Sequence, residues 1–186
     1  VKKIPIHVEG QLKGNNYMQW NIPGLNIQLG KNKADISGEF GIKDLKLDAI
    51  INAPNLDNLL PGLGGTITGD LKVRGKVDAP QVVSDLNVRQ LRFQDLHVGR
   101  IALKSDITSR ETIGGNLDLR VEGAKPGGID LSLITLGVKG DEKQHFAQLR
   151  IQCVQVSGHL EARGSFDRTF RRRRCTATHT LSANPV

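Results

Sequence analysis

Residues 64–77, Gly-Gly-Thr-Ile-Thr-Gly-Asp-Leu-Lys-Val-Arg-Gly-Lys-Val, decide the fold class. The apolar side chains Ile67, Leu71, Val73 and Val77 share one parity, and polar or small residues fill most positions between them. Because a strand directs successive side chains to opposite faces, this alternation predicts a strand with one apolar and one solvated face.

The same alternation recurs along nearly the whole chain, interrupted by turn signals such as Pro23-Gly24 and Gly140-Asp141. It predicts an all-β protein of roughly a dozen strands. Strands with one apolar and one solvated face are typical of an antiparallel sheet and argue against a parallel βαβ layout. The further apolar sets are Ile4, Ile6, Val8 and Leu12; Leu25, Ile27 and Leu29; Ile36, Phe40 and Ile42; Leu45, Leu47, Ala49 and Ile51; Val82, Leu86 and Val88; Leu91 and Phe93; Ile101, Leu103 and Ile107; Leu117, Leu119 and Val121; Ile129, Leu131 and Leu133; Leu149 and Ile151; and Val154, Val156, Leu160 and Phe166.

Two local features interrupt this pattern. The parity of the apolar positions switches between Val88 and Leu91 and again between Val98 and Ile101, which predicts bulges or tight turns there. Residues 53–61, Ala-Pro-Asn-Leu-Asp-Asn-Leu-Leu-Pro, instead place leucines at the i, i+3, i+4 spacing of a helix, between two prolines. We expect one short helix near 54–60, either as a lid over a sheet end or as a gate on an apolar groove.

Composition and charge limit the classes of protein to which this chain can belong. The chain has 186 residues, 21 of them glycine, a net charge of +7 and no apolar run near 18 residues. Five positive charges lie at Arg168 and 171–174 with no acid after them, so residues 1–167 carry only +2, too little for a nucleic-acid surface. We expect a fragment of a longer chain, with a mature secreted protein as the alternative. Residues 168–186 are expected to form a basic tail that is disordered or artefactual.

Catalytic and metal-binding signatures are weak. The sequence lacks the short motifs of serine hydrolases, zinc proteases and nucleotide-binding loops, so we expect no enzyme, no cofactor and no metal. Cys153 continues the apolar parity of Leu149 and Ile151, which favours a small core residue, while a Cys153–Cys175 disulfide stays open. A zinc set of Cys153, His159, Cys175 and His179 is a further alternative.

One region resembles the recurrent module of the TamB family. It comprises Leu56 and Leu59-Leu60-Pro61, then Gly64-Gly65-x-x-x-Gly69-x-Leu71-x-Val73-x-Gly75, then Asp78-Ala79-Pro80. The similarity of the sequence pattern extends over about residues 1–167, and residues 56–80 are its most specific part. A G-x-L-x-φ-R-G-x-φ-D pattern (φ apolar or small) occurs at Gly69–Asp78 and again at Gly158–Asp167, as in a repeated unit.

The resemblance to the TamB family implies a fold, a cellular location and a set of partners. Residues 1–167 would be a single segment of a longer periplasmic repeat protein, an elongated antiparallel sheet folded lengthwise into a hydrophobic groove, the β-taco of that family. The full protein would be anchored in the inner membrane of a Gram-negative bacterium, with membrane contact only outside this fragment. Its partners would be phospholipid or an unfolded outer-membrane β-protein, and TamA in the outer membrane through another part of the protein. No nucleic-acid partner is expected.

Three hypotheses for function follow from the strands: a lipid conduit, a chaperone or scaffold for outer-membrane β-barrel proteins, and a closed β-sandwich without a cavity. In a conduit, about twelve strands would form a trough about 55 Å long. Its lining would be branched aliphatics without polar positions. The lining predicted is Ile6, Val8, Ile27, Phe40, Leu47, Leu71, Val73, Leu86, Ile101, Leu103, Leu119, Leu131, Ile151 and Leu160.

Overall fold

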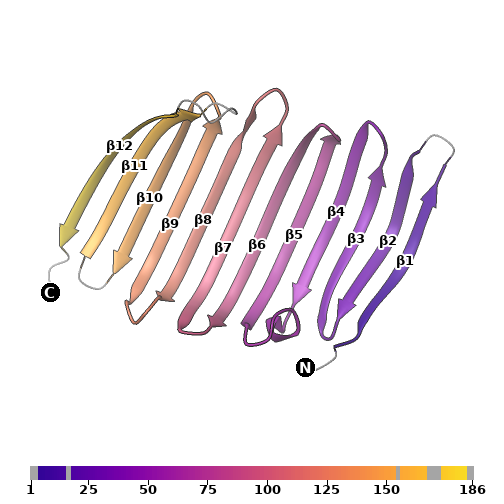
Figure 1. The fold of residues 1–186 in the computed structure, drawn as a ribbon, viewed down its shortest axis with the longest axis horizontal. Helices are drawn as coiled ribbons and strands as arrows, with labels where there is room; N and C mark the ends of the chain where they lie inside the picture. The colour runs from indigo at the N-terminus through magenta and orange to yellow at the C-terminus, as the bar shows by residue number, and fades with distance from the viewer. Residues whose placement is uncertain (1–3, 16–17, 154–155, 167–172, 184–186) are drawn as a thin grey trace.

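A computed structural model describes residues 4–15, 18–153, 156–166 and 173–183. These residues form one antiparallel sheet in which twelve strands lie side by side in chain order (Figure 1). This confirms the predicted all-β, antiparallel class. The strands are β1 Ile6–Gly14, β2 Trp20–Leu29, β3 Asn32–Phe40, β4 Asp44–Ala53, β5 Gly64–Lys76, β6 Ala79–Phe93, β7 Leu96–Ser109, β8 Ile113–Lys125, β9 Leu131–Asp141, β10 His145–Cys153, β11 Val156–Phe166 and β12 Arg173–Ala183.

The sheet is open. Its order runs from β1 to β12 without a pairing between these two, so both are edge strands. Among the described side chains, only four apolar ones are buried: Ala53, Leu56, Val98 and Ala124. Within the described ranges no second layer covers the sheet, so the closed sandwich considered from the sequence is wrong for this chain. No helix in these ranges is long and apolar enough to cross a bilayer.

The strand register separates apolar from polar side chains. Residues paired across strands share a face, and one such row crosses all twelve strands. It consists of Val8, Ile27, Ala34, Ile51, Gly69, Leu86, Leu103, Leu119, Leu136, Leu149, Leu160 and His179. The side chains one position away lie on the other face, as the period of two requires.

A line of backbone irregularities crosses the central strands near one end. Gly65, Gln90 and Gly123 have positive φ angles of 123°, 53° and 63°, and each lies where the pairing of its strand skips a residue. Gly99 and Ser132 are skipped in β7 and β9 at the matching level. The bulges predicted from the parity switches are therefore present, and they keep apolar residues on one face on both sides of the line.

The predicted helix is a single 3₁₀ turn, η1, at Leu56–Asn58, between β4 and β5 at the end of the sheet (Figure 1). Asn32 holds it: its Nδ2 donates to the carbonyl of Asn55 at 2.7 Å, and its Oδ1 accepts from the N–H of Asn55 at 2.9 Å. Asp57 accepts from the N–H of Gly62 at 2.9 Å. Because Pro61 follows three residues after Asn58, the segment is too short for a regular α-helix, and its position agrees with a cap on the sheet end.

The expectation of a disordered or artefactual tail is wrong for residues 173–183. They form β12, which pairs with β11 along its whole length. The threonines at positions 176, 178 and 180 are strand-forming residues, and an edge strand needs no continuous apolar run to complete a backbone ladder. Residues 168–172 and 184–186 lie outside the described residues.

Gly115 in β8 marks a place where the sheet tolerates only glycine. Its φ is +139°, and a Cβ built there would lie 1.9 Å from the carbonyl oxygen of Asp106 in β7. We expect Gly115→Ala to lower the free energy of unfolding by about 2–3 kcal/mol, because both the φ angle and the contact must be relieved. Gly24→Ala, which meets nothing within 4 Å, should change it by less than about 0.5 kcal/mol. Denaturant unfolding measures both, and equal effects would contradict the explanation.

Candidate functional site

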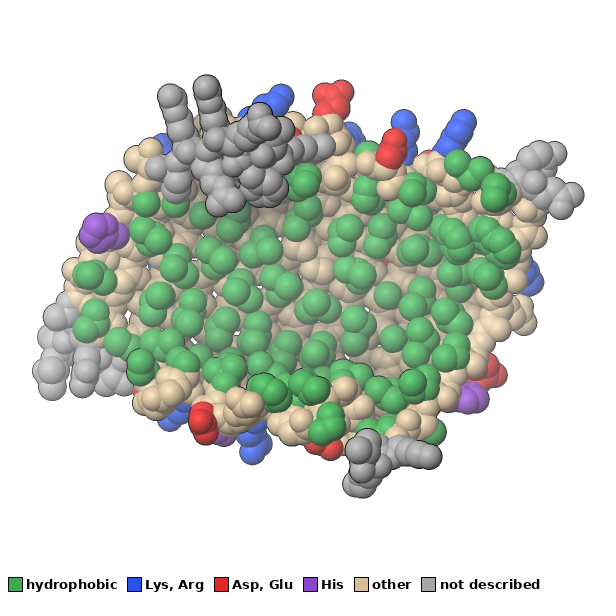
Figure 2. All heavy atoms as spheres, in the orientation of Figure 1, with side chains coloured by type: hydrophobic (Ala, Val, Ile, Leu, Met, Phe, Trp, Pro, Cys, Tyr) green, Lys and Arg blue, Asp and Glu red, His purple; other side chains and the backbone are tan. Residues whose placement is uncertain are grey.

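The apolar face of the sheet is the candidate site. We define the apolar face as the side chains in register with the row from Val8 to Leu160 and with the parallel rows at every second residue along the strands. In the orientation of Figure 2, hydrophobic side chains cover most of this face and charged ones lie around its margin. Because the sheet is open, most of these side chains are only partly buried by their neighbours in the described ranges, and the exceptions, such as Ala53 and Val98, are few.

The register places all fourteen predicted lining residues on the apolar face. Val8 pairs with Ile27, Leu47 with Val73, and Leu103 with both Leu86 and Leu119. Leu131 joins the same face by pairing with Cys153, which continues the side of Ile151 in β10. Their common placement is a structural fact, whereas their role in lining a groove stays a prediction.

Six consecutive strands also carry a leucine ladder, which we define as Leu86, Leu103, Leu119, Leu136, Leu149 and Leu160. Sequence reasoning missed Leu136 because it assigned Leu131 and Leu133 to one face. The bulge at Ser132 reverses the parity of β9, so Leu133 faces the polar side and Ile134 and Leu136 the apolar side. The apolar run after Ser132 was the available signal, but parity alone could not resolve it.

The apolar face holds a polar pair, contrary to the expectation of a lining without polar positions. Ser84 in β6 pairs with Ser105 in β7, and their hydroxyl oxygens lie 2.7 Å apart. Leu71 pairs with Ser84 from β5, and Leu117 pairs with Ser105 from β8. The two hydroxyls therefore form a polar spot within an apolar row.

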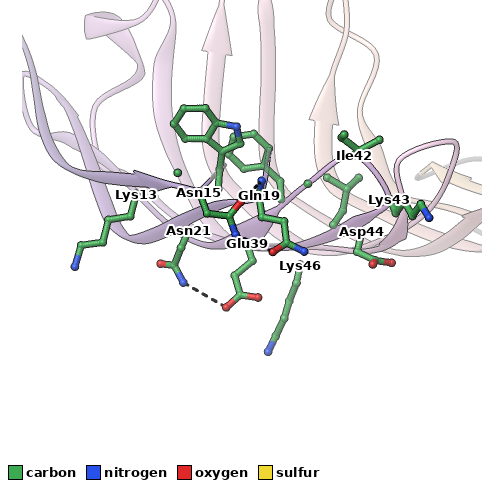
Figure 3. Close-up of a pocket in the computed structure, with 14 residues that line it drawn as sticks. Lys13, Asn15, Gln19, Asn21, Glu39, Ile42, Lys43, Asp44 and Lys46 are labelled. Carbon is green, nitrogen blue, oxygen red and sulfur yellow. Dashed lines mark hydrogen bonds between the residues drawn. The ribbon is translucent and has the colours of Figure 1, made fainter. Parts of the chain in front are cut away.

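Aromatic side chains lie at one end of the apolar face. The rings of Trp20 and Phe40 are stacked, with centroids 6.2 Å apart and planes at 13°. The indole lies over Gly14, where a Cβ would come within 2.7 Å of the ring. A hollow at this end is lined from both faces: Lys13, Asn21, Glu39 and Lys46 point to one side in Figure 3 and Ile42 to the other. It therefore belongs to the margin of the sheet.

Among the side chains that the structure describes, the charged ones lie on the opposite face and in the turns. Arg74 contacts Asp48 at 2.6 Å and Lys104 contacts Asp85 at 3.1 Å, and such partly exposed pairs contribute little stability. Hydrogen bonds from Gln148 and then His159 lower the pKa of Glu161 below 4.5. A lowered pKa means that its stabilising effect is present above about pH 4.5 and is lost as the pH falls below it.

The strand register also determines whether Cys153 and Cys175 can form a disulfide. Cys175 lies opposite Gly164, which lies opposite His145 at the start of β10, whereas Cys153 ends β10. Eight residues of strand, about 25 Å, separate these two levels. A disulfide requires Cα atoms within about 7 Å, so the sheet excludes a Cys153–Cys175 bond. No cluster of three metal-ligating side chains is found among the residues that the structure describes.

Comparison with known proteins gives the family. The family model described as "TamB, N-terminal domain" matches residues 1–185. The chain belongs to the TamB family. It is 30% identical over 184 residues to the "Translocation and assembly module subunit TamB" of Haemophilus influenzae, covering 98% of this chain and 14% of that protein. It is 27% identical over 117 residues to an uncharacterized protein of Buchnera aphidicola, covering 63% of this chain and 12% of that protein.

The match confirms the resemblance found in the sequence, and it covers the whole sheet. This TamB-family chain spans only about a seventh of the Haemophilus relative, so it corresponds to a segment of a larger protein. No solved structure matches the chain.

Proposed function

We propose that this chain is a non-enzymatic segment of a periplasmic protein that carries or shields hydrophobic clients, most directly phospholipid moved between the inner and outer membranes. The observation that supports it best is the apolar face, which crosses twelve strands and has no covering layer among the described residues. An apolar surface of this extent on a soluble protein marks a binding surface.

The energetics suit an acyl chain. Twelve strands spaced by about 4.8 Å give an apolar face more than about 50 Å long. Each methylene group removed from water contributes about 0.8 kcal/mol, so partial burial of one tail already gives several kcal/mol. The leucine ladder repeats the same side chain on six adjacent strands. Neighbouring binding positions are then close in energy, which favours sliding along the sheet.

The apolar face needs protection from water between clients. We propose that the sheet folds lengthwise around it to form the hydrophobic groove expected of the family. The line of irregularities through Gly65, Gln90 and Gly123 would provide a crease, because positive φ angles and skipped pairs let strands bend. In the full protein the groove would continue into further segments, since the Haemophilus relative is about seven times longer.

The surroundings of the segment follow from the same proposal. The whole protein would be anchored in the inner membrane, and membrane contact would be made only by parts outside this chain. The name of the Haemophilus relative makes it a subunit of a translocation and assembly module. TamA in the outer membrane would be reached through another part of the protein, and no nucleic acid is bound.

A second candidate function is a scaffold for the assembly of outer-membrane β-barrel proteins, including autotransporters. Edge strand β1 supports it: all nine of its residues are exposed, and it pairs only with β2 among the described strands. An exposed edge can accept a strand from an unfolded β-protein. Such a client would pair at the edge, whereas a lipid would cover the apolar face.

The experiment that tests the proposal is native mass spectrometry of the full-length protein purified in mild detergent from bacterial envelopes. We expect phospholipid in a defined stoichiometry, released only on unfolding. A lipid-free mass under the same conditions would overturn the conduit, and a bound outer-membrane protein would support the scaffold instead.

A further inference from the structure

The Ser84–Ser105 pair is the one polar group within the central rows of the apolar face from β5 to β8. Ser84 is only 7% exposed, whereas Ser105 is partly accessible. Two residues along each strand on the same face lie Val82, Leu86, Leu103 and Ile107. The hydroxyls are therefore surrounded by hydrocarbon in the sheet and can be reached from the apolar face at Ser105.

The pair has unused hydrogen-bonding capacity. Each serine has one O–H to donate, and the bond between the two oxygens at 2.7 Å uses only one of them. Among the residues that the structure describes, neither hydroxyl makes a further hydrogen bond. One O–H therefore remains to donate, in surroundings where an unmade hydrogen bond is costly once a hydrocarbon covers it.

We propose that Ser84 and Ser105 form a binding site for the ester carbonyl of an acyl lipid that lies on the apolar face. The free O–H donates to the carbonyl oxygen, and the acyl chain runs over the adjacent leucines. The site gives the lipid a preferred stopping position on a surface that otherwise favours sliding. This inference rests on the function proposed above and adds the group of the lipid that is recognised.

An acyl lipid fits this pair better than a client polypeptide does. An extended strand carries a carbonyl and an N–H at every residue and needs a row of partners, such as a free sheet edge. Around Ser84 and Ser105 the partners in register are Leu71 and Leu117, which offer no polar side-chain group. A single donor among hydrocarbon matches a molecule with its carbonyl next to a long apolar tail.

The sheet contains a twin of this pair on its polar face. Ser157 in β11 pairs with Ser182 in β12, and their hydroxyl oxygens are also 2.7 Å apart. Ser157 is paired with Gln152 and lies one position from Gly158, which is in register with Ile151 on the apolar face. The distance between the two oxygens is the same, but this pair lies on the polar face, Ser182 is exposed on the edge strand, and the Ser157 hydroxyl also donates to the Ser182 carbonyl at 3.4 Å. It therefore serves as a serine-pair control on the face that no acyl chain covers.

The test uses the full-length protein carrying a photoreactive benzoylphenylalanine at Leu119, one strand beyond Ser105 on the apolar face. The protein is illuminated with vesicles of a diester phosphatidylglycerol or of the diether lipid with the same headgroup and chain lengths. Cross-linked lipid is quantified by mass spectrometry. We expect the diester to be captured about two- to tenfold more than the diether, the ratio that one neutral hydrogen bond provides.

Two double variants test whether the Ser84–Ser105 pair causes the preference for the diester over the diether. S84A/S105A should remove the preference, and S157A/S182A should keep it. Replacing both partners of a hydrogen bond by methyl groups is nearly neutral for folding, which thermal unfolding of each variant checks. Equal capture of both lipids by the unchanged serines, or a preference that survives S84A/S105A, would overturn the site while leaving lipid binding intact. Capture of neither lipid, or of a polypeptide instead, would overturn the proposed function itself.

Discussion

Leu71→Arg is expected to reduce the phospholipid that co-purifies with the full-length protein by about tenfold or more. Leu71 lies on the apolar face between Ala49 and Ser84, and it is only partly buried. A guanidinium there would have to be desolvated by every acyl chain that covers it, and desolvating an unpaired charge costs several kcal/mol. Leu103→Arg, in the leucine ladder, should behave in the same way.

The control is Thr68→Arg in the same strand. Thr68 pairs with Asn52 and Asn87 on the polar face and is exposed, so the added charge stays in water. Bound lipid should be unchanged, and both variants should lose less than about 2 kcal/mol of unfolding free energy. If Leu71→Arg abolishes folding while Thr68→Arg does not, Leu71 is a core residue and the binding surface loses its support.

Leu56→Ala is expected to lower the free energy of unfolding by about 2–5 kcal/mol. Leu56 is 0% exposed and is the only large side chain among the described residues that is fully buried. It anchors η1 and the connection between β4 and β5, so its truncation leaves a cavity at the sheet end. Denaturant unfolding and limited proteolysis within residues 54–63 both measure the effect.

Leu59→Ala provides the comparison. Leu59 ends the same turn but is 52% exposed, so the change should stay within about 0.5 kcal/mol. Similar losses for Leu56→Ala and Leu59→Ala would show that the segment is held by its backbone hydrogen bonds to Asn32, with no special role for the leucine.

The fold class could be predicted because period-two alternation is a direct consequence of strand geometry. Ile67, Leu71 and Val73 lie on one face of β5, as their spacing required, and the same holds for the other predicted lining residues. The strand order follows the chain, so short turns were enough to predict antiparallel neighbours. The parity switch after Val88 also marked a real irregularity of the backbone.

The features that could not be predicted depend on how neighbouring strands pair, and the sequence of one segment does not reveal its pairing register. Leu136 was missed because one skipped residue, Ser132, reverses every later side chain of β9. β12 was missed because its backbone ladder with β11 stabilises a polar segment that has no apolar pattern of its own. The Ser84–Ser105 pair appears only when β6 and β7 are placed in register.

That no second layer covers the sheet within the described part of the chain could not be predicted either. Alternation is the same in a closed sandwich and in an open sheet, because both have one apolar side on each strand. Only the strand order and the partial burial of residues such as Leu103 distinguish them. This distinction matters for function, since an uncovered apolar face can hold a client and a packed core cannot.

The most direct test of that claim is photo-cross-linking along β7 in the full-length protein in cells. Benzoylphenylalanine is placed in turn at Ile101, Ala102, Leu103 and Lys104, which alternate between the apolar and the polar face. We expect phospholipid adducts at Ile101 and Leu103 and none at Ala102 and Lys104. Adducts at all four positions, or no lipid adduct at Ile101 and Leu103, would contradict it.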